Sequence, residues 1–176
     1  MIGRLQILPL GNVDPELLDW LSYELEKGFR ADTEILPPMD PSFAYHPERK
    51  QYHSTEILDA LSKRVTRSSW RVLAVTEVDL YVPILTFVFG EAVLGGRSAV
   101  VSYHRLRQEF YGLERNRDLL AKRLLTEAVH ELGHTMRLVH CTDHQCVMSS
   151  SHAVEWIDIK ESSFCRDCAD RALTPV

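Results

Sequence analysis

The chain has 176 residues, of which 45% are hydrophobic, and a formal net charge of -5. This length supports one compact domain with its own core and is too short for two full ones. The acidic balance offers no general attraction to polyanions, which argues against a nucleic-acid partner. No apolar run approaches the roughly 18 positions of a membrane span, and the first residues lack a secretion signal. We therefore expect a cytoplasmic protein that does not engage a membrane.

One basic stretch departs from the acidic balance. It runs from Arg105 to Arg123, and three acidic residues are interspersed in it: Glu109, Glu114 and Asp118. A mixed pattern of this kind is typical of a solvated helix face, and we interpret the stretch in this way. Its basic residues are Arg105, Arg107, Arg115, Arg117, Lys122 and Arg123.

The chain begins with a predicted strand and helix. Residues 2–8 alternate in polarity and end at Pro9, as a strand running into a turn does. Asp14 is a favourable N-cap with Pro15 at the first helical position, so a helix should follow and end near Gly28. Its buried face is formed by leucines at helical spacing: Leu17, Leu18, Leu21 and Leu25.

The next segments predict a strand, an ordered loop and a second helix. Residues 29–36 form the expected strand, which two prolines end. Residues 40–53 are polar, aromatic and marked by proline, which favours a loop or a short extended piece. A helix over residues 54–65 should then begin with Ser54 as its cap.

Three further strands are expected before a long helix. They cover residues 70–76, 84–91 and 98–104, and the glycine pair at 95 and 96 suits a tight connection between the last two. This alternation of strands and helices predicts an α/β domain with a mostly parallel sheet and at least one antiparallel edge.

Residues 116–137 read as one long helix that carries two histidines on its polar side. Counting 100° per residue, His130 and His134 lie far from the centre of the apolar arc, so they point away from the core. The arc is formed by Ala121, Leu124, Leu125, Ala128, Val129, Leu132 and Met136.

The two histidines and their neighbours predict a zinc site. Side chains four residues apart on a helix are neighbours, so His130 and His134 can bind one metal ion. Glu131 lies one step round the helix, where a carboxylate can take a proton from a zinc-bound water whose pKa the metal lowers to roughly 7. His140 can supply a third nitrogen if the helix ends near Arg137 and the chain turns back, which gives the open tetrahedral arrangement of catalytic zinc.

The stretch HELGHTMRLVHC, the following Cys146 and Met148, and the later CRDC resemble the archaemetzincins, a branch of the metzincin metallopeptidases. Their signature is HExxHxxGxxHCx4CxM followed by CxxC, and the match runs from His130 to Cys168. Upstream, YHPERKQYHS and DLYVPILTFVFGEA are also similar to that family.

The resemblance implies a metzincin-like fold: a twisted mixed sheet with helices, a long active-site helix, and a C-terminal segment bound through a four-cysteine zinc site. It also implies roles for single residues: His130, His134 and His140 bind the catalytic zinc, Glu131 is the general base and Met148 is the Met-turn residue. The expected single domain covers 1–176, with a sheet-and-helix part over 1–137 and a zinc-bound part over 138–176.

The chain departs from the family pattern at two places. Arg137 replaces the glycine that ends the helix in a left-handed conformation, which costs another residue about 1 kcal/mol. Either the turn survives with strain, or it takes another shape that moves His140 out of reach. The spacing from Met148 to Cys165 is also one residue shorter than the pattern.

The four cysteines all lie after residue 140 and predict a second, structural zinc site. Two close pairs suit a closed four-thiolate site formed by Cys141, Cys146, Cys165 and Cys168. Two disulfides are the alternative, but a chain without a secretion signal should keep its thiols reduced. A redox CxxC is less favoured, because it needs a thioredoxin-like surrounding. A short helix is expected over residues 164–173.

The other histidines show no ligand-like spacing, and we interpret them as surface or local hydrogen-bonding residues. They are His46, His53, His104, His144 and His152.

These features predict a zinc metallopeptidase with two zinc ions per chain and a peptide or protein substrate, whose strand hairpin offers an edge for an extended peptide. The alternative is a zinc-stabilised binding module with a vestigial active site, for which Arg137 is the best support. A nucleic-acid-binding zinc ribbon is disfavoured by the acidic balance. The oligomeric state is open.

Overall fold

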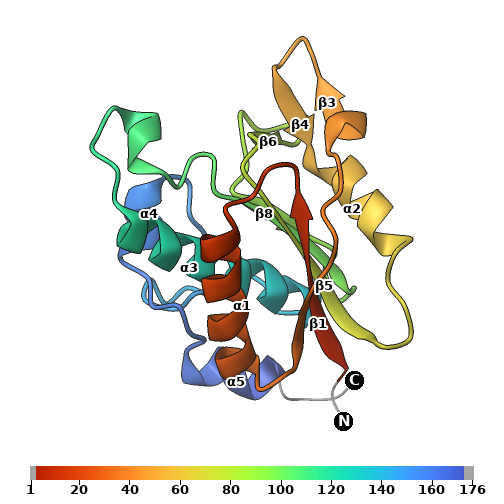
Figure 1. Cartoon of the computed structure of the whole chain (residues 1–176). Coiled ribbons are helices and arrows are strands. Elements are labelled where there is room, and N and C mark those ends of the chain that lie inside the picture. Colours follow the sequence, from red (N-terminus) through yellow and green to blue (C-terminus); the bar gives the residue numbers. More distant parts are fainter. Residues whose placement is uncertain (1–2, 173–176) are drawn as a thin grey trace.

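The computed structural model describes residues 3–172, and its centre is a five-stranded mixed sheet with helices on both faces (Figure 1). The strand order is β2-β1-β5-β8-β7, in which only β7 runs antiparallel to its neighbour. The predicted α/β class with an antiparallel edge is therefore confirmed. The strands are β1 (Arg4–Leu10), β2 (Thr33–Ile35), β5 (Ser69–Thr76), β7 (Gly90–Ala92) and β8 (Ser98–Ser102).

The central strands are buried on both faces, because helices cover each side of the sheet. α1 (Pro15–Phe29) and α3 (Arg117–Thr135) lie on one face, and α2 (Ser54–Ser62) lies on the other (Figure 1). Along β1, Leu5 and Ile7 join the core cluster under α1 and α3, whereas Leu8 and Leu10 join the cluster under α2.

α1 follows the sequence prediction closely at its start. The Asp14 side chain accepts hydrogen bonds from the first turn, and Pro15 is the first helical residue. The helix ends at Phe29, one residue beyond the predicted Gly28, and Arg30 closes it in a left-handed conformation (φ 51°). Residue 29 is therefore helical, and β2 is shorter than the predicted strand.

Pro9 does not end β1, which was a second error. Pro9 pairs with Val75 of β5, and the strand continues to Leu10. The odd-numbered residues of β1 direct their backbone groups toward the β2 side, as in Leu5 N–H to Asp32 O. Beside Pro9 this side lies past the end of β2, so the missing N–H costs no ladder hydrogen bond.

The segment predicted as a loop over residues 40–53 contains regular structure. A short 3₁₀ helix η1 (Ser42–Ala44) leads into the hairpin of β3 (Tyr45–His46) and β4 (Gln51–His53). β4 also pairs with β6 (Leu80–Tyr81), which gives a second, three-stranded sheet. Ser54 does not cap α2, because its hydroxyl donates to the Tyr81 carbonyl (3.2 Å) and His53 takes the cap position.

The strands predicted after residue 70 are confirmed in part. β5 and β8 form, and β7 and β8 make the hairpin that the glycine pair predicted, with Gly95 at φ 67°. The prediction over 84–91 was wrong for most of its length, since only its last two residues, Gly90 and Glu91, belong to β7. The chain before them forms a wall of the cleft described below.

The predicted long helix is α3, whose Asn116 side chain caps it by accepting from Leu119 N–H (3.0 Å). The basic stretch was predicted to be a solvated helix face, and this was wrong for part of it. Arg123 is buried and makes an ion pair with Asp158 (2.6 Å), while Arg105 pairs with Asp79 (2.7 Å) beside the short helix η2 (Gln108–Tyr111).

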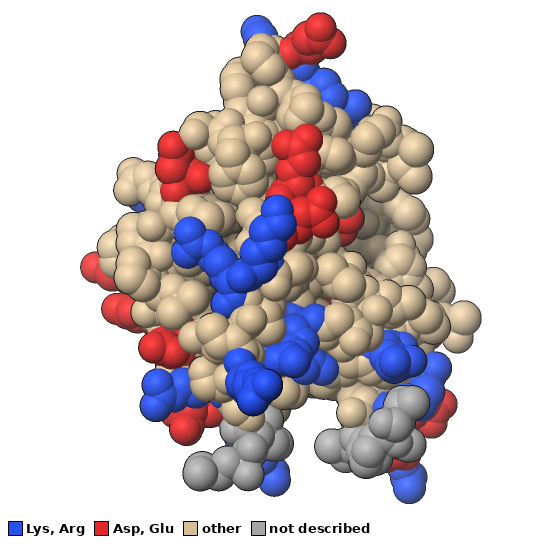
Figure 2. Space-filling view, turned by 90° about the vertical axis from the view of Figure 1, so that its right-hand side faces the viewer, with Lys and Arg blue, Asp and Glu red and all other residues tan. Residues whose placement is uncertain are grey.

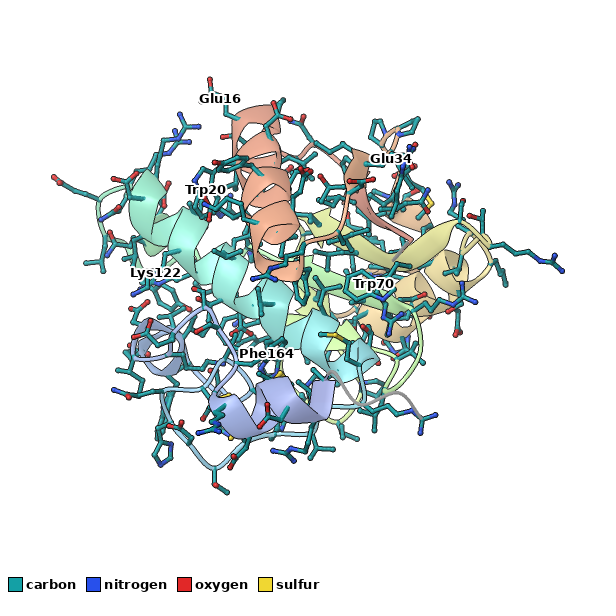
Figure 3. The ribbon with its side chains drawn as sticks, turned by 90° about the horizontal axis from the view of Figure 1, so that it is seen from below. Glu16, Trp20, Glu34, Trp70, Lys122 and Phe164 are labelled. Carbon is teal, nitrogen blue, oxygen red and sulfur yellow. The ribbon has the colours of Figure 1, made fainter. Side chains whose placement is uncertain are left out.

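The C-terminal segment, residues 138–172, packs against α3. It contains two short helices, α4 (Val154–Asp158) and α5 (Arg166–Ala172). α5 confirms the predicted terminal helix, and position 173 lies outside the described residues. Phe164 lies between α3 and α5 (Figure 3) and stacks edge-on with Phe29 of α1 at 6.3 Å. The segment thus packs against the helix that carries the two histidines.

Figure 2 shows basic and acidic side chains sharing one face of the molecule. That face is therefore not uniformly basic. Within residues 3–172, no helix is long and apolar enough to cross a membrane.

Candidate active site

α3 and the chain that follows it bring three histidines together. His130 and His134 lie on the last turns of α3, and His140 follows the bend. One ring nitrogen of each lies within 4.8 Å of the others, and the Nε2 atoms of His130 and His134 are 3.1 Å apart. The three imidazoles that the sequence singled out therefore face one common point.

Backbone carbonyls orient two of these rings. His130 Nδ1 lies 2.7 Å from Val147 O, and His134 Nδ1 lies 2.8 Å from Leu138 O. A carbonyl at this position accepts the Nδ1 proton and leaves Nε2 free to bind a metal. Both Nε2 atoms point to the shared centre, which is the arrangement that zinc ligands require.

Desolvation favours the neutral form of the three rings, the form that binds metal, even at the more exposed His140. Desolvation lowers the pKa of His130 to about 3, with the positive charge of Lys160 as the next contribution. Desolvation also lowers the pKa of His134 and of His140. Three neutral nitrogens with one open side fit a catalytic zinc ion.

The bend that carries His140 keeps its left-handed shape although Arg137 stands where a glycine is usual. Arg137 has φ 67°, and Leu138 N–H bonds to Gly133 O (3.1 Å), as in a helix end of the Schellman type. Gly95 of the β7–β8 turn also donates to His134 O (2.9 Å). Of the two shapes expected from sequence, the strained turn is the one found.

Glu131 is buried beside the histidines, with 5% of its surface exposed. It faces Gly90 of β7, where an added Cβ would lie 2.7 Å from the Glu131 carboxylate. Desolvation raises its pKa well above the usual value, and the charges of Glu127 and Glu91 add to this effect. A raised pKa brings a carboxylate closer to the range of an effective general base.

His130 and Glu131 point away from the apolar arc but not toward solvent. The prediction from periodicity was incomplete here, because β7 and the C-terminal segment cover the polar side of α3. His130 is only 5% exposed. The result is a partly enclosed cleft of about 670 Å³, whose walls include Phe87, Glu91 and His152.

Two functional candidates were missed in the sequence, namely Glu127 and Lys160. Lys160 Nζ lies 3.3 Å from Glu127 Oε1 and donates to the carbonyls of Ser149 (2.8 Å) and Val147 (3.3 Å). Both side chains are almost fully buried. The only signal in the sequence was an acidic residue four positions before Glu131. Its partner lies 33 residues away and has no local pattern.

The four cysteines meet in a second cluster, as the sequence predicted. The four Sγ atoms lie within 4.8 Å of one another, and all four cysteines are free thiols that form no disulfide. Cys141 Sγ and Cys165 Sγ are 3.9 Å apart, and Cys146 Sγ accepts the backbone N–H groups of Met148 and Cys165. Zinc bonds of about 2.3 Å to four sulfurs suit such a spacing.

Met148 is fully buried against α3. Its sulfur lies against Gly133 of α3, where an added Cβ would overlap it. Met148 O also accepts the N–H of Cys141, the residue after His140 (3.0 Å). The predicted Met-turn residue thus links the histidine and cysteine clusters.

The other five histidines separate into different environments. His104 bonds to Glu77 O (3.0 Å), His144 lies near Trp156, and His152 lines the cleft. His46 and His53 form local hydrogen bonds, as predicted, although their spacing in the sequence gave no sign that they meet. Both contact the same carboxylate, which the fold brings between them.

Comparisons with known proteins agree on one family. The pattern of peptidase family M54 matches residues 42–173. The archaemetzincin of Methanocaldococcus jannaschii is 45% identical over 96% of this chain and 92% of its own length, and that of Pyrococcus furiosus is 41% identical over 92% and 88%.

Solved structures give the same result. The archaemetzincin of Archaeoglobus fulgidus in complex with malonate has a TM-score of 0.83 at 39% identity. A zinc-dependent peptidase from Methanocorpusculum labreanum has a TM-score of 0.86 at 27% identity. Each comparison covers 96% of this chain and 99% of the other.

Proposed function

The chain belongs to peptidase family M54, the archaemetzincins, which are zinc metallopeptidases, and we propose that His130, His134 and His140 hold its catalytic zinc with Glu131 as the general base. The observation that supports this assignment best is the convergence of three ring nitrogens within 4.8 Å beside a buried carboxylate. The reaction is hydrolysis of a peptide bond.

A zinc ion held by the three rings would act as a Lewis acid, which would polarise the scissile carbonyl and lower the pKa of a bound water molecule. Glu131 takes one proton from the attacking water as the new C–O bond forms. The same carboxyl then gives a proton to the amine nitrogen as the C–N bond breaks, so the glutamate ends in its starting state. Burial of Glu131 supports both transfers. It raises the pKa of the carboxyl, so that the group holds the proton more readily between the two transfers.

The backbone of β7 is proposed to align the substrate. β7 is the edge strand of the five-stranded sheet, and Glu91 and Ala92 line the cleft beside the histidines. An extended peptide can add to such an edge through main-chain hydrogen bonds, which places its carbonyl without regard to side-chain identity.

We also propose that Cys141, Cys146, Cys165 and Cys168 hold a second, structural zinc ion. Four free sulfurs within 4.8 Å of one another form a closed donor set with no position for a substrate. The role of this ion is to fix the loop between His140 and Met148 against α5.

The test is Glu131→Gln, with the exposed Glu155→Gln as the matched control. Hydrolysis of a peptide library, followed by mass spectrometry, should fall by about 10²–10⁴-fold in Glu131→Gln and stay unchanged in the control. Zinc content should be equal in all three proteins. Wild-type activity in Glu131→Gln would refute the assignment of the general base.

A zinc count separates this proposal from the alternative of a binding module with a vestigial site. Two ions that remain after dialysis support the peptidase with its structural site. One ion, lost only when the cysteines are replaced, supports the module. The left-handed Arg137 is compatible with the first outcome, because the bend it forms keeps His140 within reach of the other rings.

A further inference from the structure

A third cluster of potential metal ligands lies outside the two described above. It consists of His46 in β3, His53 at the start of α2, and Glu56 in the first turn of that helix. One ligand atom of each lies within 4.8 Å of the others. We propose that these three side chains form a third metal site, which binds a divalent transition-metal ion such as zinc and remains open to solvent on one side.

The spacing of the ligand atoms fits a metal ion. Glu56 Oε1 lies 3.0 Å from His46 Nε2 and 3.0 Å from His53 Nδ1. Metal bonds of about 2.0–2.1 Å place tetrahedral ligand atoms roughly 3.3 Å apart, so a small outward shift accommodates an ion. The Nε2 atoms of His130 and His134 show a similar separation, 3.1 Å.

The chemistry of the three donors selects the class of ion. Two imidazole nitrogens and one carboxylate suit zinc, copper or nickel, whereas calcium and magnesium prefer oxygen ligands alone. One negative charge opposite a divalent ion leaves a net positive site that can take water as a further ligand. The His46 and Glu56 side chains are 43% and 40% exposed, which leaves room for this ligand.

His53 is the anchored member of the cluster. Its ring stacks on Tyr81 of β6, with centroids 5.1 Å apart and an interplanar angle of 23°. Its Nε2 is buried and has no hydrogen-bond partner among residues 3–172. The stacking on Tyr81 holds the ring in place while Nδ1 faces Glu56 and the proposed ion.

An ion at this position would fix one wall of the active-site cleft. The turn of the β3–β4 hairpin carries Arg49, whose guanidinium donates to the carbonyls of Leu85 (2.8 Å) and Thr86 (3.1 Å). Gln51 of β4 also donates to Thr86 O (3.0 Å). Since Leu85 and Thr86 line the cleft, the proposed ion ties α2 to the hairpin that holds this wall.

A cluster held only by hydrogen bonds is the simpler alternative, in which both rings donate to Glu56. Glu56→Gln distinguishes the two cases. The glutamine Oε1 can still accept from both histidines, so the hydrogen bonds remain, but the charge that binds the ion is lost. Glu48→Gln, an exposed change in the turn of the same hairpin, is the matched control.

The experiment compares the full-length wild type, Glu56→Gln, His46→Ala and Glu48→Gln. Each protein is titrated with zinc under a competing chelator, and its bound zinc is counted after gel filtration at about 10 μM free zinc, a concentration that fills a micromolar site. Crystals equilibrated at the same zinc concentration are measured at the zinc absorption edge.

We expect one more zinc ion in the wild type and in Glu48→Gln than in Glu56→Gln and His46→Ala. An anomalous peak should lie about 2.0–2.2 Å from the three ligand atoms in the wild type. Equal zinc counts in all four proteins, or no peak between His46, His53 and Glu56, would overturn the proposal. Because the result is a difference between variants, it holds whatever the occupancy of the catalytic and cysteine sites.

Discussion

The sheet and the C-terminal segment both pack against α3, but they are held in place by different interactions. The sheet is buried in two apolar clusters, with fully buried side chains such as Leu5, Leu73 and Val100. The C-terminal segment adds some apolar contacts but contains only two short helices. Its specific anchors are the cysteine cluster and buried Lys160.

The difference matters because the proposed site needs both regions. α3 supplies His130, Glu131 and His134, while His140 and Met148 belong to the segment after the helix. Apolar packing is spread over many residues, so one substitution weakens it only in part. The C-terminal anchors are few, and the loss of one should displace a ligand.

Removal of a cysteine should have the largest effect. Cys168→Ser takes one ligand from the proposed structural zinc, and we expect a loss of at least about 4 kcal/mol, a fraction of the ~10–16 kcal/mol that zinc contributes to small zinc domains. Thermal unfolding and zinc content measure the change.

Leu21→Ala is the control for the sheet side of the comparison. Leu21 is fully buried in the core, and its truncation should cost about 2–5 kcal/mol without any change in zinc content. An unchanged zinc content in Cys168→Ser would contradict the proposed anchoring by zinc.

Lys160→Met should have the second-largest effect. It leaves Glu127 buried without its cation, and breaking such a pair costs about 3–5 kcal/mol. In the double variant Lys160→Met with Glu127→Gln, most of that loss should be recovered, because no uncompensated charge remains. Urea unfolding of the wild type, both single variants and the double variant tests this, and additive losses would show that the two residues act independently.

Gly90→Ala should lower both activity and stability. The added Cβ would lie 2.7 Å from Glu131 and from Val100 O, so the carboxylate must move. A displacement of a catalytic group by about 1 Å can lower kcat by about 10²-fold. Peptide hydrolysis at saturating substrate tests this, with the exposed Gly28→Ala in α1 as control. Wild-type kcat in Gly90→Ala would show that the position of Glu131 tolerates the shift.

Arg137→Gly should have the smallest effect and the opposite sign. Relief of the left-handed conformation should stabilise the protein by about 1 kcal/mol. Chemical denaturation checks the gain. A loss of stability would mean that contacts of the Arg137 side chain, such as its packing on Gly95, outweigh the strain.

The sequence predicted the parts of the structure that depend on local or repeated patterns. The cap at Asp14, the helix with His130 and His134, and the β7–β8 hairpin follow from capping, periodicity and turn residues. The cysteine cluster followed from spacing and from the family resemblance.

What was missed depends on contacts between distant residues. The β3–β4 hairpin has strands of only two and three residues, too short to show alternation. Lys160 reaches Glu127 across 33 positions, and His46 meets His53 only because the hairpin folds back. Pro9 was read by its usual role, whereas its nitrogen faces the side of β1 where β2 has already ended.

The carbonyl oxygen of Val147 serves two side chains at once. It lies 2.7 Å from His130 Nδ1 and 3.3 Å from Lys160 Nζ. The tilt of the His130 imidazole therefore depends on the position of a peptide group that a remote ammonium holds in place. A disturbance at Lys160 should consequently appear as weaker metal affinity at His130 well before the molecule unfolds.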